Sequence, residues 1–197
     1  MTVSPDRARK LYEDGVAHFT GLVHAIKAGD WRRPTPCTEW SVRDLVNHLT
    51  SEALWIPPLL SGATIADIGD EYDGDVLGPE PVRAWTGAAA AALAAVAAPD
   101  VADRTVHLSY GDTTATHYVF QLGTDLLIHG WDLARGIGAD DSLDPDDVHL
   151  VRTETGDTDL ASSGFFDPPV PVDDDADEQT RLLATFGRDR AADPGQR

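Results

Sequence analysis

The amino-acid sequence predicts an all-α protein: a four-helix bundle with a short β-hairpin or irregular insertion and a C-terminal tail helix. Four long stretches carry apolar residues three and four positions apart, which is the spacing of one helix face. Only one short stretch alternates as a strand does, and no repeat of fixed period is visible. Amphipathic helices with so little strand bury their apolar faces against one another, and this arrangement is a bundle.

The chain of 197 residues is predicted to be a single domain, with a core over about residues 4–163 and a tail over residues 164–197. Hydrophobic residues make up 42% and charged residues 25% of the chain, which is typical of a globular protein. A chain of this length folds without needing a disulfide or a metal ion. The tail is expected to end in a short helix at about residues 181–186.

The first helix is predicted from Ser4 to near Gly29. Ser4 offers a capping hydroxyl and Pro5 suits the first helical position. The apolar stripe that follows continues for about five turns. A loop over residues 30–40 then leads to the second helix.

The second helix is predicted to begin at Ser41, which forms a capping box with Asp44. The pair Pro57-Pro58 is expected to end or kink this helix, because proline lacks the N–H that a helical position donates. A surface loop rich in glycine and aspartate is expected over residues 61–81.

The third helix is predicted from about Pro81, and its many alanines would let another helix approach closely. Residues 104–110 alternate as a short strand or hairpin arm does, with Gly111-Asp112 as the turn. The fourth helix is predicted from about Thr113 to Ile137, and a fifth, weakly patterned segment starts at Asp144.

Acidic residues dominate the charge. The chain holds 34 Asp and Glu against 15 Lys and Arg, for a formal net charge of −19. Such a charge repels phosphate backbones and anionic headgroups, so neither nucleic acid nor a membrane is an expected partner. Because no long apolar run and no signal peptide is visible, a cytoplasmic location is expected. The single cysteine, Cys37, excludes an internal disulfide and a cysteine-based zinc cluster.

Bundles build ligand sites from polar side chains that point inward from facing helices. In the fourth helix, Asp125 and His129 lie one turn apart on an apolar stripe. His48 lies at the margin of the apolar face of the second helix. If these helices face each other, two imidazoles and a carboxylate converge, a set that binds Zn²⁺, Ni²⁺ or Fe²⁺ with a position left open. We therefore predict His48, Asp125 and His129 as ligands of a divalent metal, with zinc as the first choice.

Alternatives without a metal stay open for these residues. A histidine at an apolar margin is commonly a hydrogen-bonded core residue. A buried Asp125 needs a partner, because an unpaired buried carboxylate is costly, and His129 or Arg135 could supply it. Asp132 is predicted to pair with Arg135 on the same helix or, alternatively, to support a metal ligand from behind.

Other candidates are weaker. His117 lies about 12 Å from Asp125 by helix rise, too far to share an ion with both ligands. The remaining histidines are expected at the surface: His18, His24, His107 and His149. Cys37 is a second-choice nucleophile, since nothing in the sequence lowers its pKa. No role is assigned to Trp131, and no phosphate loop or nucleophile elbow is present.

Three stretches resemble one family: residues 35–49 (Thr-Pro-Cys-Thr-Glu-Trp-Ser-Val-Arg-Asp-Leu-Val-Asn-His-Leu), residues 129–135 (His-Gly-Trp-Asp-Leu-Ala-Arg) and residues 182–189 (Leu-Leu-Ala-Thr-Phe-Gly-Arg-Asp). They are similar to actinobacterial proteins related to the N-terminal domain of mycothiol-dependent maleylpyruvate isomerase. That family belongs to the DinB/YfiT-like superfamily, so the resemblance implies a DinB-like four-helix bundle.

The resemblance also implies a divalent metal held by a histidine late in the second helix and by an acid and a histidine one turn apart. These positions are His48, Asp125 and His129. The acid is aspartate where the isomerase has glutamate, which leaves tight, monodentate or water-bridged ligation open. The sequence shows no counterpart of the isomerase's second domain, so maleylpyruvate isomerisation itself is not the expected reaction.

The expected function is that of a metal-dependent enzyme that uses a low-molecular-weight thiol, mycothiol by resemblance, in transfer, conjugation or isomerisation of an electrophilic substrate. A thiol with a free pKa of about 8.5 is deprotonated on such an ion. The alternatives are a hydrolase that activates water on the same ion and a non-catalytic bundle that stores or senses metal. Monomer and homodimer are both open.

Overall fold

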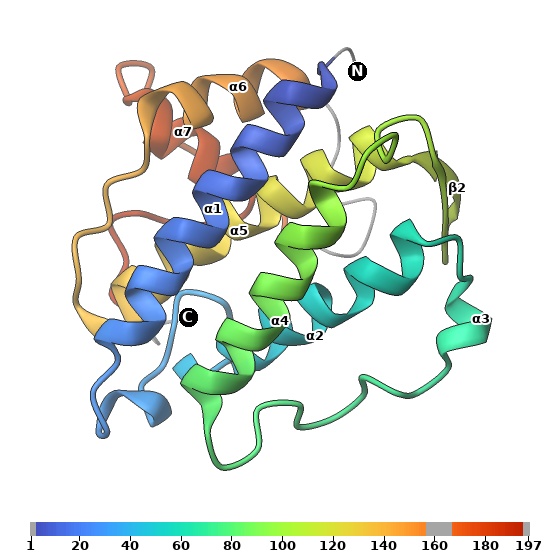
Figure 1. Cartoon of the computed structure of the whole chain (residues 1–197). Coiled ribbons are helices and arrows are strands. Elements are labelled where there is room, and N and C mark those ends of the chain that lie inside the picture. Colours follow the sequence, from blue (N-terminus) through green and yellow to red (C-terminus); the bar gives the residue numbers. More distant parts are fainter. Residues whose placement is uncertain (1–2, 157–166, 195–197) are drawn as a thin grey trace.

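The structure is a computed structural model that describes residues 3–156 and 167–194. Its long helices are α1 (Pro5–Ala25), α2 (Val42–Leu60), α4 (Pro81–Val96) and α5 (Ala115–Ile137) (Figure 1). Its short helices are η1 (Asp30–Arg32), α3 (Ile65–Ile68), α6 (Pro145–Thr155) and α7 (Glu178–Thr185).

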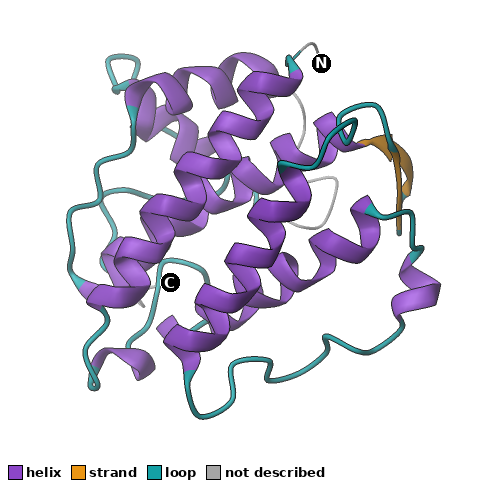
Figure 2. Ribbon diagram, in the orientation of Figure 1, coloured by secondary structure: helices purple, strands orange, loops and turns teal. Residues whose placement is uncertain are grey.

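Helix predominates, and the sheet found in the described residues is one antiparallel hairpin, β1 (Thr105–Leu108) and β2 (Gly111–Thr114) (Figure 2). The predicted all-α fold with a hairpin insertion is therefore confirmed. Over the same residues, none of the helices combines the length and the apolar character needed to cross a lipid bilayer.

The four long helices pack as two pairs, α1 with α5 and α2 with α4 (Figure 1). Contacts between α1 and α4 and between α2 and α5 join the pairs. Trp85 of α4 fills the centre, where its indole N–H donates to the Thr20 hydroxyl at 2.9 Å and its ring meets Phe19 edge-on. The α2–α5 contact brings together the helices that carry the predicted ligands.

Helices α1 and α5 approach closely because each contributes a glycine to the contact. A Cβ on Gly15 would lie 2.9 Å from Leu126 Cβ, and one on Gly123 would lie 2.8 Å from Leu11 Cγ and 3.0 Å from the Tyr12 backbone nitrogen. Any larger residue at these positions pushes the helices apart. The close packing of α5 against α1 thus depends on the absence of a Cβ atom at Gly15 and Gly123.

The C-terminal ends of α1 and of α2 differ from the sequence prediction. Helix α1 ends at Ala25 rather than near Gly29. Helix α2 continues through Pro57 and Pro58 to Leu60, so the proline pair lies in its last turn. The Ser61 hydroxyl and backbone N–H both donate to the Pro57 carbonyl, which satisfies a carbonyl in the last turn of the helix.

The stretch over residues 61–81 is more ordered than the predicted surface loop. It contains α3, which begins at a capping box formed by Thr64 and Asp67. Beyond α3, the stretch is fastened along α2: Arg43 pairs with Asp75, and Asn47 bonds to the backbone of residues 74 and 76. The sequence holds the capping-box signal at Thr64, which the composition of the stretch obscures.

The hairpin turn lies two positions earlier than predicted. Ser109 and Tyr110 form the turn, whereas Gly111 and Asp112 belong to β2 and pair with Leu108 and His107. Because β2 continues through Thr114, helix α5 begins at Ala115 and not at Thr113, with the Thr114 hydroxyl as its cap.

The C-terminal tail packs onto the bundle. Helix α7 starts at Glu178, three residues before the predicted helix, because Asp177 accepts a hydrogen bond from the Thr180 backbone N–H at 2.7 Å. The side chains of Leu182, Leu183 and Phe186 join the same hydrophobic core as the long helices. The tail therefore lies close to α5 and its polar residues.

We expect Gly123→Ala to lower the free energy of unfolding by about 1–3 kcal/mol, because the new methyl group overlaps Leu11 and the Tyr12 backbone. Gly21→Ala is the matched control, since Gly21 also lies within a helix but has open space around it. It should stabilise by about 0.5–1 kcal/mol. Urea unfolding measures both, and shifts of the same sign would contradict the close approach.

Candidate metal centre

Three polar side chains from α2 and α5 meet at the edge of the core. The Asp125 carboxylate lies between two imidazoles: Oδ2 is 3.5 Å from His48 Nε2, and Oδ1 is 3.5 Å from His129 Nε2. The potential ligand atoms all lie within 4.8 Å of one another. The structure thus brings together the three residues that the sequence predicts as ligands.

Helical spacing places these side chains. On α5, Leu122 and Leu126 are buried beside Asp125, so burial of the stripe turns Asp125 and His129 inward. On α2, the buried Leu45 and Leu49 hold His48 at the margin, where its side chain stays 30% exposed. His129 is only 6% exposed.

Asp132 supports His129 from behind. The Asp132 side chain has no exposed surface, and its Oδ2 accepts a hydrogen bond from His129 Nδ1 at 2.9 Å. An ionised carboxylate only accepts hydrogen bonds, so the shared proton belongs to Nδ1, and Nε2 is the ring nitrogen that faces Asp125. Arg188 of the tail neutralises Asp132 through Nη2 at 2.9 Å and Nε at 3.4 Å.

Neighbouring groups of opposite charge stabilise the ionised forms of Asp132, Asp125 and His48. Burial opposes ionisation of Asp132, but the Arg188 charge and the His129 hydrogen bond outweigh it and lower the pKa of the carboxyl. Burial likewise opposes ionisation of Asp125, and the two histidines lower its pKa. Burial opposes protonation of His48, yet Asp125 raises the pKa of that imidazole. Both carboxylates are therefore anionic at neutral pH.

The loop before α2 covers one side of the site. The Trp40 ring lies 4.8 Å from the His48 ring and stacks at 5.7 Å on His129. Glu39, just before it, has a φ of 68°, in the left-handed region that few non-glycine residues adopt. Burial raises the pKa of the Cys37 thiol in the same loop to about 12, so this thiol is protonated at neutral pH. The nucleophile alternative for Cys37 finds no support.

A cavity of about 930 Å³ opens beside the three residues. Its lining advances along α2 from His48 to Leu59, which is about 16 Å by helix rise. Arg104, just before β1, donates to the Leu60 carbonyl at 2.9 Å, so the far end of the cavity lies against the hairpin. The cavity therefore extends from the three polar residues to the insertion.

Glu52 lines the same cavity, one helical turn beyond His48. Burial and the nearby Asp125 both raise the pKa of the Glu52 carboxyl, although His48 and His129 act in the opposite direction. The cavity thus holds a carboxyl group whose pKa lies above that of an exposed glutamate.

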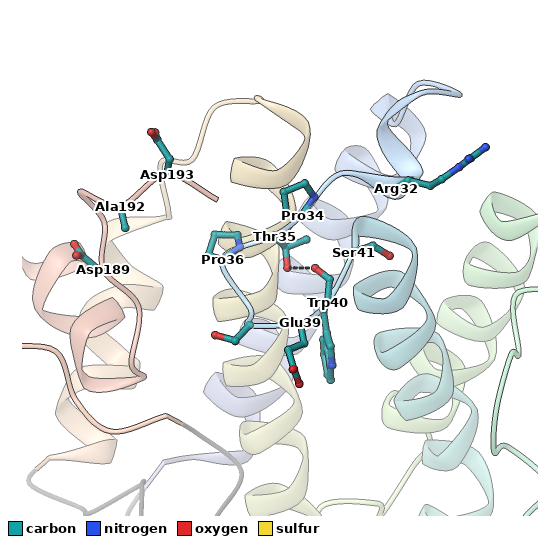
Figure 3. A pocket seen from close by; sticks show the side chains of 11 residues that line it. Arg32, Pro34, Thr35, Pro36, Glu39, Trp40, Ser41, Asp189, Ala192 and Asp193 are labelled. Carbon is teal, nitrogen blue, oxygen red and sulfur yellow. Dashed lines mark hydrogen bonds between the residues drawn. The ribbon is translucent and has the colours of Figure 1, made fainter. Parts of the chain in front are cut away.

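A second cavity, of about 420 Å³, lies between loop residues 32–41 and tail residues 189–193 (Figure 3). The Thr35 hydroxyl donates to the Trp40 carbonyl at 3.0 Å beside it. Trp40 lines both cavities, but none of the three predicted ligands lines the smaller one. The smaller cavity is therefore separate from the candidate metal centre.

Most of the other sequence predictions for single residues agree with the structure. His18, His24 and His149 are exposed, and His107 bonds to Asp112 across the hairpin at 2.7 Å. His117 lines the far part of the large cavity.

The predicted ion pair of Asp132 with Arg135 is wrong. Asp132 pairs with Arg188, whereas Arg135 bonds to Asp141 and to the Ala192 carbonyl. The Asp132 side chain points into the bundle toward His129, and the Arg188 side chain reaches the same place from the tail. Arg188, which is distant in sequence, is therefore the ion-pair partner of Asp132 in place of Arg135 on the same helix. The alternative, in which Asp132 supports a ligand, agrees with the hydrogen bond to His129.

Sequence reasoning assigned no role to Arg188, Glu52 and Trp40. The signal for Glu52 was its spacing of four residues from His48, which places both on one face of α2. Trp40 and Arg188 lie within stretches that resemble the family, but no local sequence pattern indicates that they contact the site. Their contacts depend on how the loop and the tail pack against the bundle.

Comparison with known families decides what kind of bundle this is. The model of the mycothiol maleylpyruvate isomerase N-terminal domain matches residues 12–134, more than half of the chain. The chain belongs to this family. The matched region of the mycothiol maleylpyruvate isomerase N-terminal domain includes His48, Asp125 and His129.

The chain is also similar in sequence to two mycobacterial proteins. Uncharacterised proteins of Mycobacterium tuberculosis strains CDC 1551 / Oshkosh and H37Rv are each 31% identical over 128 residues. This match covers 65% of the chain and 66% of those proteins, just under two thirds of their length.

Solved structures agree with the fold of the mycothiol maleylpyruvate isomerase N-terminal domain family. Crystal structures of the mycothiol-dependent maleylpyruvate isomerase and of a histidine-to-alanine mutant of it share 16% and 15% sequence identity with this chain. Both give a TM-score of 0.64 and cover 82% of this chain and 75% of theirs. The resemblance seen in the sequence is confirmed at the level of family and fold.

We expect Arg188→Ala to lower the free energy of unfolding by about 3–5 kcal/mol, because it leaves the Asp132 carboxylate buried without its cation. Arg190→Ala is the matched control, since Arg190 pairs with the exposed Asp177, and it should cost at most about 1 kcal/mol. In urea unfolding, the double variant Asp132→Ala/Arg188→Ala should lose less than the sum of the single losses. Equal losses for Arg188→Ala and Arg190→Ala would refute this account of the ion pair.

Proposed function

We propose that His48, Asp125 and His129 bind one divalent metal ion, and that the protein is an enzyme which uses this ion to activate a low-molecular-weight thiol. The reaction would be the transfer of the thiol to an electrophile, its conjugation, or a thiol-assisted isomerisation. The observation that carries the proposal is the convergence of two imidazole nitrogens and a carboxylate on the wall of a large cavity.

The donor atoms fit such an ion. Ligands at 2.0–2.2 Å from a tetrahedral zinc ion lie about 3.4 Å apart, and the carboxylate of Asp125 is 3.5 Å from each imidazole Nε2. Three protein ligands beside a cavity leave a coordination position open, as catalytic zinc sites do. The same donor set suits nickel or iron, and zinc is our first choice.

A divalent ion held by two neutral imidazoles and one carboxylate keeps a net charge of about +1 and lowers the pKa of a thiol that ligates it. The protein's own groups do the rest. Asp132 keeps the Nε2 lone pair of His129 directed at the site, and Trp40 keeps water from one side. The Glu52 carboxylate is placed to accept the proton that the thiol loses and to return it to the product.

Mycothiol is our first candidate for the thiol. The family is named for a mycothiol-using isomerase, and the solved relative is described as mycothiol-dependent. The cavity of about 930 Å³ is at the large end of the range for ligand pockets, so it has room for a low-molecular-weight thiol beside a second small molecule. The partners we propose are accordingly a small-molecule thiol and an electrophilic substrate.

Purified protein should carry about one equivalent of divalent metal, and His48→Ala and His129→Ala should each lose most of it, because two remaining donors hold an ion weakly. His24→Ala is the matched control, since His24 is exposed on α1. Elemental analysis after removal of metal by chelation and reloading with zinc measures the difference. Equal metal content in all four proteins would remove the proposed site.

Calorimetric titration should show that the zinc-loaded protein binds mycothiol, and that the chelator-treated protein and His129→Ala do not, because the thiol needs the ion to bind as thiolate. Glutathione and bacillithiol, titrated in parallel, show how selective the site is. If the zinc-loaded protein binds none of the three thiols, the thiol proposal fails, and activation of water for hydrolysis becomes the function to test.

A further inference from the structure

The far part of the large cavity differs in character from the part near the metal centre. We propose that it binds the second substrate, and that this substrate is an uncharged, apolar electrophile and not a carboxylate anion. The inference rests on the proposed function, because it names the class of molecule that would receive the thiol.

Apolar side chains from four elements form most of the walls of the far part, and polar groups are added to the lining of the same cavity by Ser109, Tyr110, His117 and Gln121. Trp55 and Leu59 belong to α2, Ile65 begins α3, and Leu108 ends β1. Phe120 and Leu122 of α5 also line the cavity. A molecule placed there exchanges water for aliphatic and aromatic surface, which favours an apolar ligand.

These walls are fixed before any ligand arrives. The Trp55 ring packs edge-on against Tyr72 at 5.8 Å, within the stretch fastened along α2. A β-bridge between Thr64 and His107 joins the start of α3 to the hairpin. Because α2, α3 and the hairpin hold one another, the apolar end is a shaped subsite with little to rearrange on binding.

The charged groups of the cavity oppose an anion. Besides the proposed ligand Asp125, Glu52 and Asp167 place carboxyl groups in its lining, and among the described residues of that lining the only guanidinium is that of Arg188. All three nitrogens of Arg188 are engaged: Nε and Nη2 bond to Asp132, and Nη1 donates to the Phe186 carbonyl at 2.7 Å. Burial lowers the pKa of His117, so this imidazole is neutral at neutral pH.

A carboxylate bound at the apolar end would therefore lose its hydration and gain no cation. Removal of an ion from water without a partner is among the most costly steps in binding. An uncharged molecule of the same shape avoids this cost and keeps the gain from the apolar walls. The cavity thus discriminates by charge between substrates of similar size.

Methyl cinnamate and cinnamate provide a matched pair, since both are rigid and differ mainly in charge. Ligand-observed NMR titration of the zinc-loaded full chain should give a dissociation constant at least about tenfold lower for the ester. The same ratio is expected for His129→Ala, because the apolar end does not include the metal ligands. Loss of metal in that variant tests the proposed function, whereas the ratio tests only the subsite.

Leu108→Lys should weaken binding of the ester and strengthen binding of cinnamate, because it places a cation at the apolar end. Thr105→Lys is the matched control on the same strand, since Thr105 is exposed and lies outside the lining, and it should leave the ratio unchanged. If Leu108→Lys does not fold by circular dichroism, Ile65→Lys makes the same test from the neighbouring helix α3.

The proposal is overturned if wild-type protein binds cinnamate as tightly as the ester or within tenfold of it, or binds neither molecule. It is also overturned if a folded lysine variant at the apolar end keeps the wild-type ratio. A preference for the ester that reverses in Leu108→Lys or Ile65→Lys, but not in Thr105→Lys, supports it.

Discussion

The Asp132 carboxylate is charged and has no exposed surface, and the arrangement around the candidate metal centre depends on how that charge is compensated. Arg188 supplies the cation from 56 positions further along the chain, and His129 supplies a hydrogen bond from the preceding turn. A buried carboxylate with only one of these partners would be strongly destabilising. The orientation of His129 therefore depends on the docking of the tail onto the bundle, which couples the C-terminal fold to the geometry of the site.

Because of this coupling, each part of the site depends on the packing of another part of the fold. The glycines at positions 15 and 123 determine how closely α5 packs against α1. The position of α5 in turn determines where the side chains of Asp125 and His129 lie. The hydrogen bond from His129 to Asp132 then fixes the tautomer of His129. Trp40 then covers the pair of imidazoles from the loop. The large negative charge of the chain, −19 overall, has little part in this, since a few neighbouring groups decide the local balance.

The sequence predicts what depends on spacing within one helix and misses what depends on the return of distant segments. Asp125 and His129 share a face because they are four residues apart, and His48 follows from an apolar stripe. Spacing within the helix predicts Arg135 as the partner of Asp132 and gives no indication of Arg188. Local residue preferences likewise predict the hairpin turn at Gly111 and Asp112, which are typical turn residues, yet strand pairing with Leu108 and His107 places the turn at Ser109 and Tyr110.

The division of the cavity between bundle and insertion has a consequence for how members of this family diversify. The residues that would hold the ion lie on α2 and α5, whose packing leaves them little freedom to vary, whereas Ile65 and Leu108 lie on α3 and β1, outside the four long helices. Substitutions at Ile65 and Leu108 would alter the part of the cavity that receives the acceptor and leave the residues of the four long helices unchanged. Related chains that keep the three ligands and differ at these two positions would share one chemistry and differ in substrate range.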